Sequence, residues 1–147
     1  MAPKQAFAVI AVLFVVALSP QAHAQAGGIT LAIEKHAQLT EGGAMLISIQ
    51  IACGPFEGVE EFQQAFAGGV QEKTGAESES GIDGTVVCDG VQRTHTARLP
   101  SFTSAAFRRG PAGANASLIV CMFAGNEQMC FSGATARRVI VRGAAIP

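Results

Sequence analysis

The stretch from Met45 to Cys53 alternates apolar and less apolar residues more regularly than any other part of the chain. One side of the alternation carries Ile47, Ile49, Ile51 and Cys53. In an extended backbone successive side chains point to opposite faces, and β-branched residues favour strands over helices. The stretch therefore predicts a half-buried strand with Cys53 on its inward face.

Further short strands are predicted by the same criterion over 29–33, 85–88, 94–99, 114–123, 130–131 and 138–142. Both faces of 114–123 are apolar, which indicates a central strand. The polar stretch 72–81 is expected to be an exposed loop, and 100–111 a longer connection. The pattern predicts an all-β chain of seven or eight short strands, arranged as an antiparallel β-sandwich.

The stretch 59–71 is ambiguous between strand and helix. Val59, Phe62 and Phe66 fit a helical stripe, whereas Phe62, Phe66 and Val70 also fit one face of a strand. The pair Gly68-Gly69 disfavours a long helix. A strand is the preferred interpretation, and a helix stays the alternative.

The amino end has the form of a secretory signal peptide. Lys4 precedes an apolar run of 13 residues, Ala6 to Leu18, and Ala22-His23-Ala24 supplies a small-x-small cleavage site. A run this short is typical of a signal rather than a membrane span, which needs about 20 apolar residues. We expect residues 1–24 to be removed, leaving an exported domain over 25–147, periplasmic or secreted, with no membrane span.

All four cysteines follow the predicted signal. Export and an even count favour disulfides, and no close cysteine pair with the spacing of a zinc site is present. Four cysteines allow three pairings, of which we expect Cys53–Cys88 with Cys121–Cys130. The latter two flank a turn-like stretch, 124–128, and would face each other across a hairpin.

Charge is unevenly distributed along the chain. Residues 57–89 carry eight acids and one base, whereas residues 93–147 carry seven arginines and one acid. Either neighbouring strands pair these charges, or the arginines form a face for an anionic partner. Arg108 and Arg109 are the candidate interaction face. Because the chain is slightly acidic and lacks Trp and Tyr, a nucleic-acid partner is not expected.

Catalytic motifs are absent from the sequence. No G-x-S-x-G occurs, and after the signal only His36 and His95 could act as an imidazole base. Acid pairs such as Glu77 and Glu79 do not match the spacing of a calcium-binding loop. Sugar-binding sites usually include aromatic side chains for stacking, and the chain has no Trp or Tyr. We predict no catalytic residue, no cofactor and no metal site.

Several short motifs lie between Ile47 and Ala114. They are the strand ending in Cys53-Gly54, the pair Val70-Gln71, the step Cys88-Asp89-Gly90, His95 in the next strand, and Phe107 followed by Gly110 and Ala112. Through them this stretch resembles a group of uncharacterised, secreted bacterial immunoglobulin-like domains. The resemblance covers about half of the expected mature chain. It implies a two-layer β-sandwich with a Cys53–Cys88 bridge, and no activity.

The expected hairpin Cys121–Cys130 is similar to the small disulfide loop of the secreted neocarzinostatin-type chromoprotein carriers, which are also β-sandwiches. The front half of the chain does not match those carriers. We therefore expect an exported, non-catalytic immunoglobulin-like module that binds an extracytoplasmic protein or anionic surface, or serves a structural role. The alternative is a small-ligand carrier.

Overall fold

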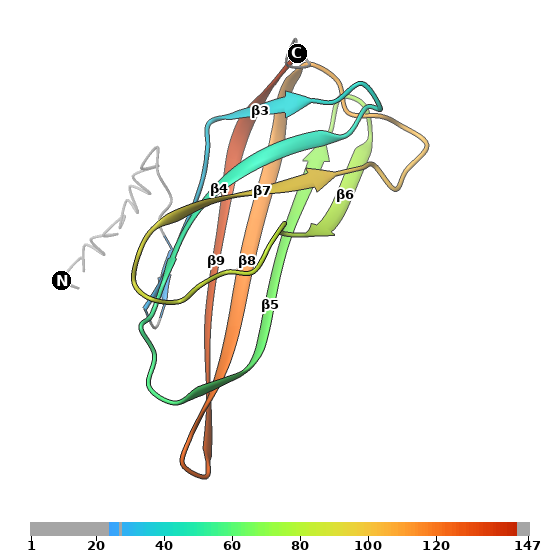
Figure 1. Cartoon of the computed structure of the whole chain (residues 1–147). Helices are drawn as coiled ribbons and strands as arrows, with labels where there is room; N and C mark the ends of the chain where they lie inside the picture. The colour runs from blue at the N-terminus through green and yellow to red at the C-terminus, as the bar shows by residue number, and fades with distance from the viewer. Residues whose placement is uncertain (1–23, 27, 144–147) are drawn as a thin grey trace, which may run out of the picture.

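The computed structural model describes residues 24–26 and 28–143. The predicted signal peptide lies outside these residues, apart from Ala24. The described residues form nine strands in a mixed, mostly antiparallel sheet (Figure 1). The chain is therefore all-β, as the alternation of its residues predicts.

The strand bounds are β1 (Ala24–Ala26), β2 (Ile29–Ile33), β3 (His36–Leu39), β4 (Met45–Cys53), β5 (Val59–Gln71), β6 (Ala76–Gly81), β7 (Arg93–Leu99), β8 (Gly110–Ala124) and β9 (Glu127–Arg142). The pairing order is β1-β2-β4-β3-β9-β8-β5-β6, with β7 on β4. Only β3 and β9 pair in parallel; the other described pairs are antiparallel.

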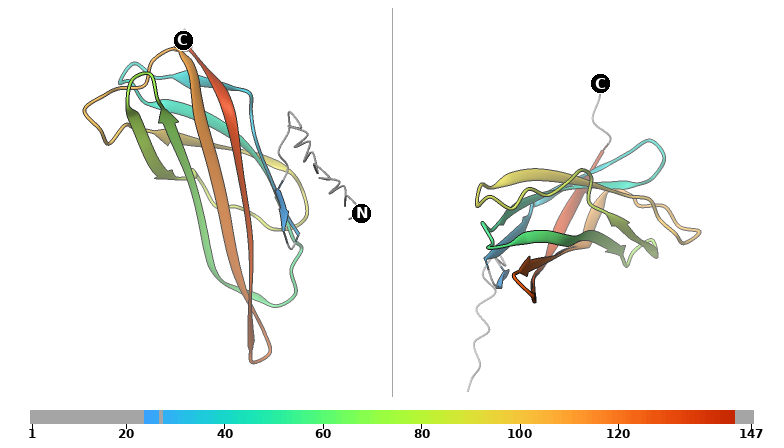
Figure 2. Two further views of the ribbon diagram at one scale, coloured as in Figure 1. Left: turned by 180° about the vertical axis from the view of Figure 1, so that it is seen from behind. Right: turned by 60° about the horizontal axis from the view of Figure 1, so that its bottom comes forward.

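Strand β3 links two groups of strands, because it pairs with β4 and also with β9. Views from opposite sides place β4 and β7 on one side of the molecule and β5, β8 and β9 on the other (Figures 1 and 2). The inward side chains of both groups are buried against each other in one core. This arrangement leaves the outward face of β5, β8 and β9 open to solvent.

The core is closely packed where β5 passes β4 and β7. A Cβ added at Gly69 would lie 2.4 Å from Met45 Cε and 3.2 Å from Leu99 Cδ1. The aromatic ring of Phe107, which is buried, reaches the same point. Because Gly69 carries no side chain, the ends of Met45, Leu99 and Phe107 fill the space beside β5.

The clearest expected strands are confirmed. Strand β4 has the bounds predicted for it, with its isoleucines and Cys53 buried. The ambiguous stretch 59–71 is a strand, β5. Strands β2, β7 and β8 contain the segments predicted at 29–33, 94–99 and 114–123, and β8 is central between β5 and β9.

Three expectations were wrong. The stretch 72–81 is not all loop, because Ala76–Gly81 forms β6, an edge strand that buries Ala76 and Ser78. The segment 85–88 is not a strand but part of the connection between β6 and β7. The two short strands predicted near the carboxyl end are one continuous strand, β9.

Candidate interaction site

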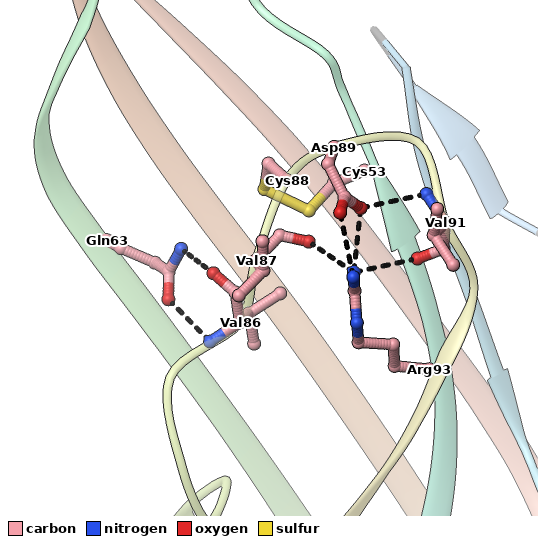
Figure 3. The surroundings of a disulfide bond; sticks show 8 residues. All are labelled: Cys53, Gln63, Val86, Val87, Cys88, Asp89, Val91 and Arg93. Carbon is pink, nitrogen blue, oxygen red and sulfur yellow. Dashed lines mark hydrogen bonds and ion pairs between the residues drawn. A yellow bond between two sulfur atoms is a disulfide. The ribbon is translucent and has the colours of Figure 1, made fainter.

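Both disulfides have the predicted pairing, Cys53–Cys88 and Cys121–Cys130. The first joins the end of β4 to the irregular connection 82–92. The Gln63 side chain of β5 holds that connection too: its Nε2 donates to Val86 O at 2.7 Å, and its Oε1 accepts from Val86 N at 3.1 Å (Figure 3). A segment without strand pairing is thereby fixed to both groups of strands.

An ion pair closes the same connection. Arg93 Nη1 and Nη2 each lie 2.7 Å from one carboxylate oxygen of Asp89, and Val91 N donates to Asp89 Oδ1 (Figure 3). The hydrogen bonds from Arg93 and Val91 hold the pKa of Asp89 well below its ordinary value. Because both side chains are exposed, this pair orders the turn more than it stabilises the fold.

We expect the Cys121–Cys130 disulfide to be reduced before Cys53–Cys88. Cys121 and Cys53 are both buried, but Cys130 is exposed on β9 whereas Cys88 is half-buried, and nucleophilic attack by a reductant requires access to a sulfur atom. Stepwise titration with a water-soluble phosphine, alkylation and peptide mass mapping would measure the order. Alkylated Cys53 appearing at lower reductant than alkylated Cys130 would contradict this expectation.

The loop that carries Arg108 and Arg109 is held from inside the protein. Gln71, at the end of β5, is only 2% exposed, and its Nε2 donates to Arg108 O at 2.8 Å and Pro111 O at 3.3 Å. Its Oε1 accepts from Arg108 N at 2.8 Å. The preceding Phe107 is buried and donates its N–H to Gly43 O. The backbone is fixed so that both arginine side chains point to solvent.

The guanidinium groups of Arg108 and Arg109 have no carboxylate partner in the part of the chain that the structure describes. The ion pair found there is Arg93–Asp89, which joins the connection 82–92 to the first residue of β7. Among the described residues, the acidic stretch 57–89 and the later arginines therefore form no direct ion pair between neighbouring strands. Arg109 lies against the backbone of Gly143, where an added Cβ would be 2.5 Å from its Nη2.

Other bases surround the loop. Lys73 and Arg138 line a surface depression of about 420 Å³, together with Val70, Glu72, Pro111, Ala112 and Gly113. We call Lys73, Arg108, Arg109, Arg138 and Arg142 the basic end. Arg142 Nη2 lies 2.7 Å from His36 Nε2. Desolvation and the nearby Arg142 lower the pKa of His36.

Sequence reasoning missed the role of Gln71. Gln71 could have been noticed as a polar residue on the inward face of a strand. It lies two residues after Gly69, which faces the core, so the two residues share that face. The sequence does not reveal that Gln71 meets a loop 37 residues later in the chain. The other titratable candidate, His95, has its Nδ1 3.4 Å from the backbone carbonyl oxygen of Asp83.

Among residues 24–26 and 28–143, no three His, Cys, Asp or Glu side chains gather where they could hold a metal ion. Within the same residues no helix is long and apolar enough to cross a bilayer. No protein-family model, curated protein or solved structure matches the chain. The basic end, with its internally fixed loop, is the feature from which a function can be argued.

Proposed function

We propose that the chain is an exported, non-catalytic binding module of immunoglobulin-like β-sandwich type, whose basic end meets an anionic partner. The observation that carries this proposal is the buried Gln71. A fully buried amide is costly unless it is hydrogen-bonded. Here all three of its bonds to residues 108–111 serve to fix the loop that presents Arg108 and Arg109.

The sandwich part of the proposal is supported by the strand pairing. Strands β2, β4 and β7 form one group and β9, β8, β5 and β6 the other, with β3 passing between them. The space between the groups is filled by side chains such as Met45, Leu99 and Phe107. Because the depression at the basic end lies on the surface instead, a binding module is favoured over a ligand carrier.

Export is supported by two features. The apolar run 6–18 followed by Ala22-His23-Ala24 has the form of a cleavable signal. The two disulfides point to an oxidising compartment outside the cytoplasm. A periplasmic or a secreted location satisfies both.

Retention on immobilised heparin, a polyanion, tests the arginine face. Arg108→Ala and Arg109→Ala should each elute at lower salt than the unmodified protein, because each removes an exposed charge from the fixed loop. Arg98→Ala is the matched control, since Arg98 is exposed on β7, in the other group of strands. Equal shifts for all three variants would show that only total charge matters and would remove the support for this face.

A further inference from the structure

The β8–β9 hairpin projects beyond the rest of its sheet (Figure 1). Its neighbour β5 begins at Val59, which pairs with Phe123, and the hairpin continues past this point through residues 124–127. Val59 is 74% exposed and Phe62 47%, and Phe123 and Met129 are exposed as well. We call these four residues, with the Cys121–Cys130 disulfide and Glu127, the hairpin end.

Three of the four apolar side chains of the hairpin end are neighbours on one face. Val59 lies opposite Phe123, and Phe62 lies opposite Cys121, so these side chains share the outward face. Met129 pairs with the inward Met122 and occupies the other side of the hairpin. The disulfide joins β8 to β9 close to the hairpin turn. A fixed, projecting group of large apolar side chains is typical of an interaction surface.

The hairpin end and the basic end carry opposite charges. Residues 54–64 and 121–130 contain four glutamates and no lysine or arginine. The basic end has five bases, with Glu72, Glu77 and Glu79 as the acids of the adjoining turn and strand. Val59 and Val70 lie at opposite ends of β5, which separates the two regions by about 36 Å at the usual rise of a strand.

The basic end also offers an apolar surface. Val70 is exposed beside Gly113 and Arg138 in the register of β5, β8 and β9, and the exposed Ile140 lies opposite Pro111. Val70 and Pro111 line the depression of about 420 Å³ with Lys73 and Arg138. An apolar site with basic side chains is thus complementary to an apolar projection with acidic ones.

We infer that the hairpin end of one copy docks into the depression at the basic end of a second copy. Such a contact joins two different surfaces, so it extends into chains or closes into a ring. A contact between two hairpin ends would bring like charges together, which opposes it. The inference rests on the proposed function in one respect, since it gives the basic end a specific acidic partner.

Sedimentation velocity on the full-length exported protein, with both disulfides intact and no polyanion present, tests this contact. We expect association that increases with protein concentration and weakens as salt rises from low to high ionic strength. The hairpin variant Phe123→Ser/Glu127→Gln, which removes the acidic charge without reversing it, and the basic-end variant Arg138→Glu should each weaken self-association by about tenfold or more. Arg98→Glu, on the other group of strands, should leave it unchanged.

Mixing the two variants provides the decisive measurement. The basic-end variant keeps a native hairpin end, and the hairpin variant keeps a native basic end. One native contact can therefore form between one molecule of each variant, and the mixture should contain such heterodimers. A monomeric unmodified protein, a mixture that fails to pair, or a basic-end variant that still self-associates normally would each overturn the inference. Heparin retention that still depends on Arg108 and Arg109 would then leave the proposed function standing.

Discussion

Replacing Cys53 and Cys88 together by alanine is expected to lower the free energy of unfolding by about 4 kcal/mol, since the bridge closes a long loop in the unfolded chain. The two cysteines are 35 residues apart, and Cys53 is buried at the end of β4. The connection that this bridge holds has no strand pairing of its own. Its remaining attachments are the buried side chains of Ile82 and Val86 and a set of hydrogen bonds, which includes the two between Gln63 and Val86.

The matched control is Cys121→Ala/Cys130→Ala. This bridge spans only 9 residues and joins strands that are already paired in a hairpin. Chain entropy assigns it about 3 kcal/mol at most, and the pairing of β8 with β9 already holds its two cysteines opposite each other, so the measured loss should be smaller. Urea unfolding of both variants, followed by circular dichroism, gives the comparison. A larger loss for the hairpin bridge would contradict the expected order.

The sequence predicts those strands that bury one face in strict alternation. In β4 each inward residue is apolar, so the period of two is visible without any knowledge of the partner strand. Strand β6 has the sequence Ala-Glu-Ser-Glu-Ser-Gly, and its inward Ser78 is accommodated by donating to Pro100 O at 2.6 Å. That acceptor is supplied by tertiary structure, and for this reason the local sequence resembles a loop.

The candidate site shows the same limit. Pairing of Cys121 with Cys130 follows from local hairpin geometry, and it is predictable. The exposure of Arg108 and Arg109 depends on Gln71, which is distant in sequence and is brought close only by the packing of β5 against the loop. Likewise, a count of charges along the chain cannot show that the acids of the hairpin end and the basic end lie at opposite ends of the same strands.

Gly54→Ala is expected to lower the free energy of unfolding by about 3 kcal/mol, from backbone strain and close contact together. Gly54 has a φ of 71°, in the left-handed region that disfavours a side chain. A Cβ there would lie 2.6 Å from Cys88 O and 3.0 Å from Phe56 N. Both are backbone atoms, so neither can move aside as the end of a flexible side chain would.

Gly125→Ala separates these two causes. Gly125, in the hairpin turn, has a similar φ of 66°, but an added Cβ would meet nothing within 4 Å. Its expected cost is therefore the left-handed strain alone, about 1 kcal/mol. Equal losses in urea unfolding for the two variants would show that the contact with Cys88 O has no energetic effect.

The bridge and the glycine should also be coupled energetically. The carbonyl that would meet the new Cβ belongs to Cys88, which the disulfide holds against the end of β4. In the Cys53→Ala/Cys88→Ala background this carbonyl can move away from the new Cβ. The loss in free energy of unfolding caused by Gly54→Ala should then fall towards the loss caused by Gly125→Ala. A double-mutant cycle measures the difference. Additive losses would mean that Gln63 and its two bonds to Val86 hold the connection in place without the disulfide.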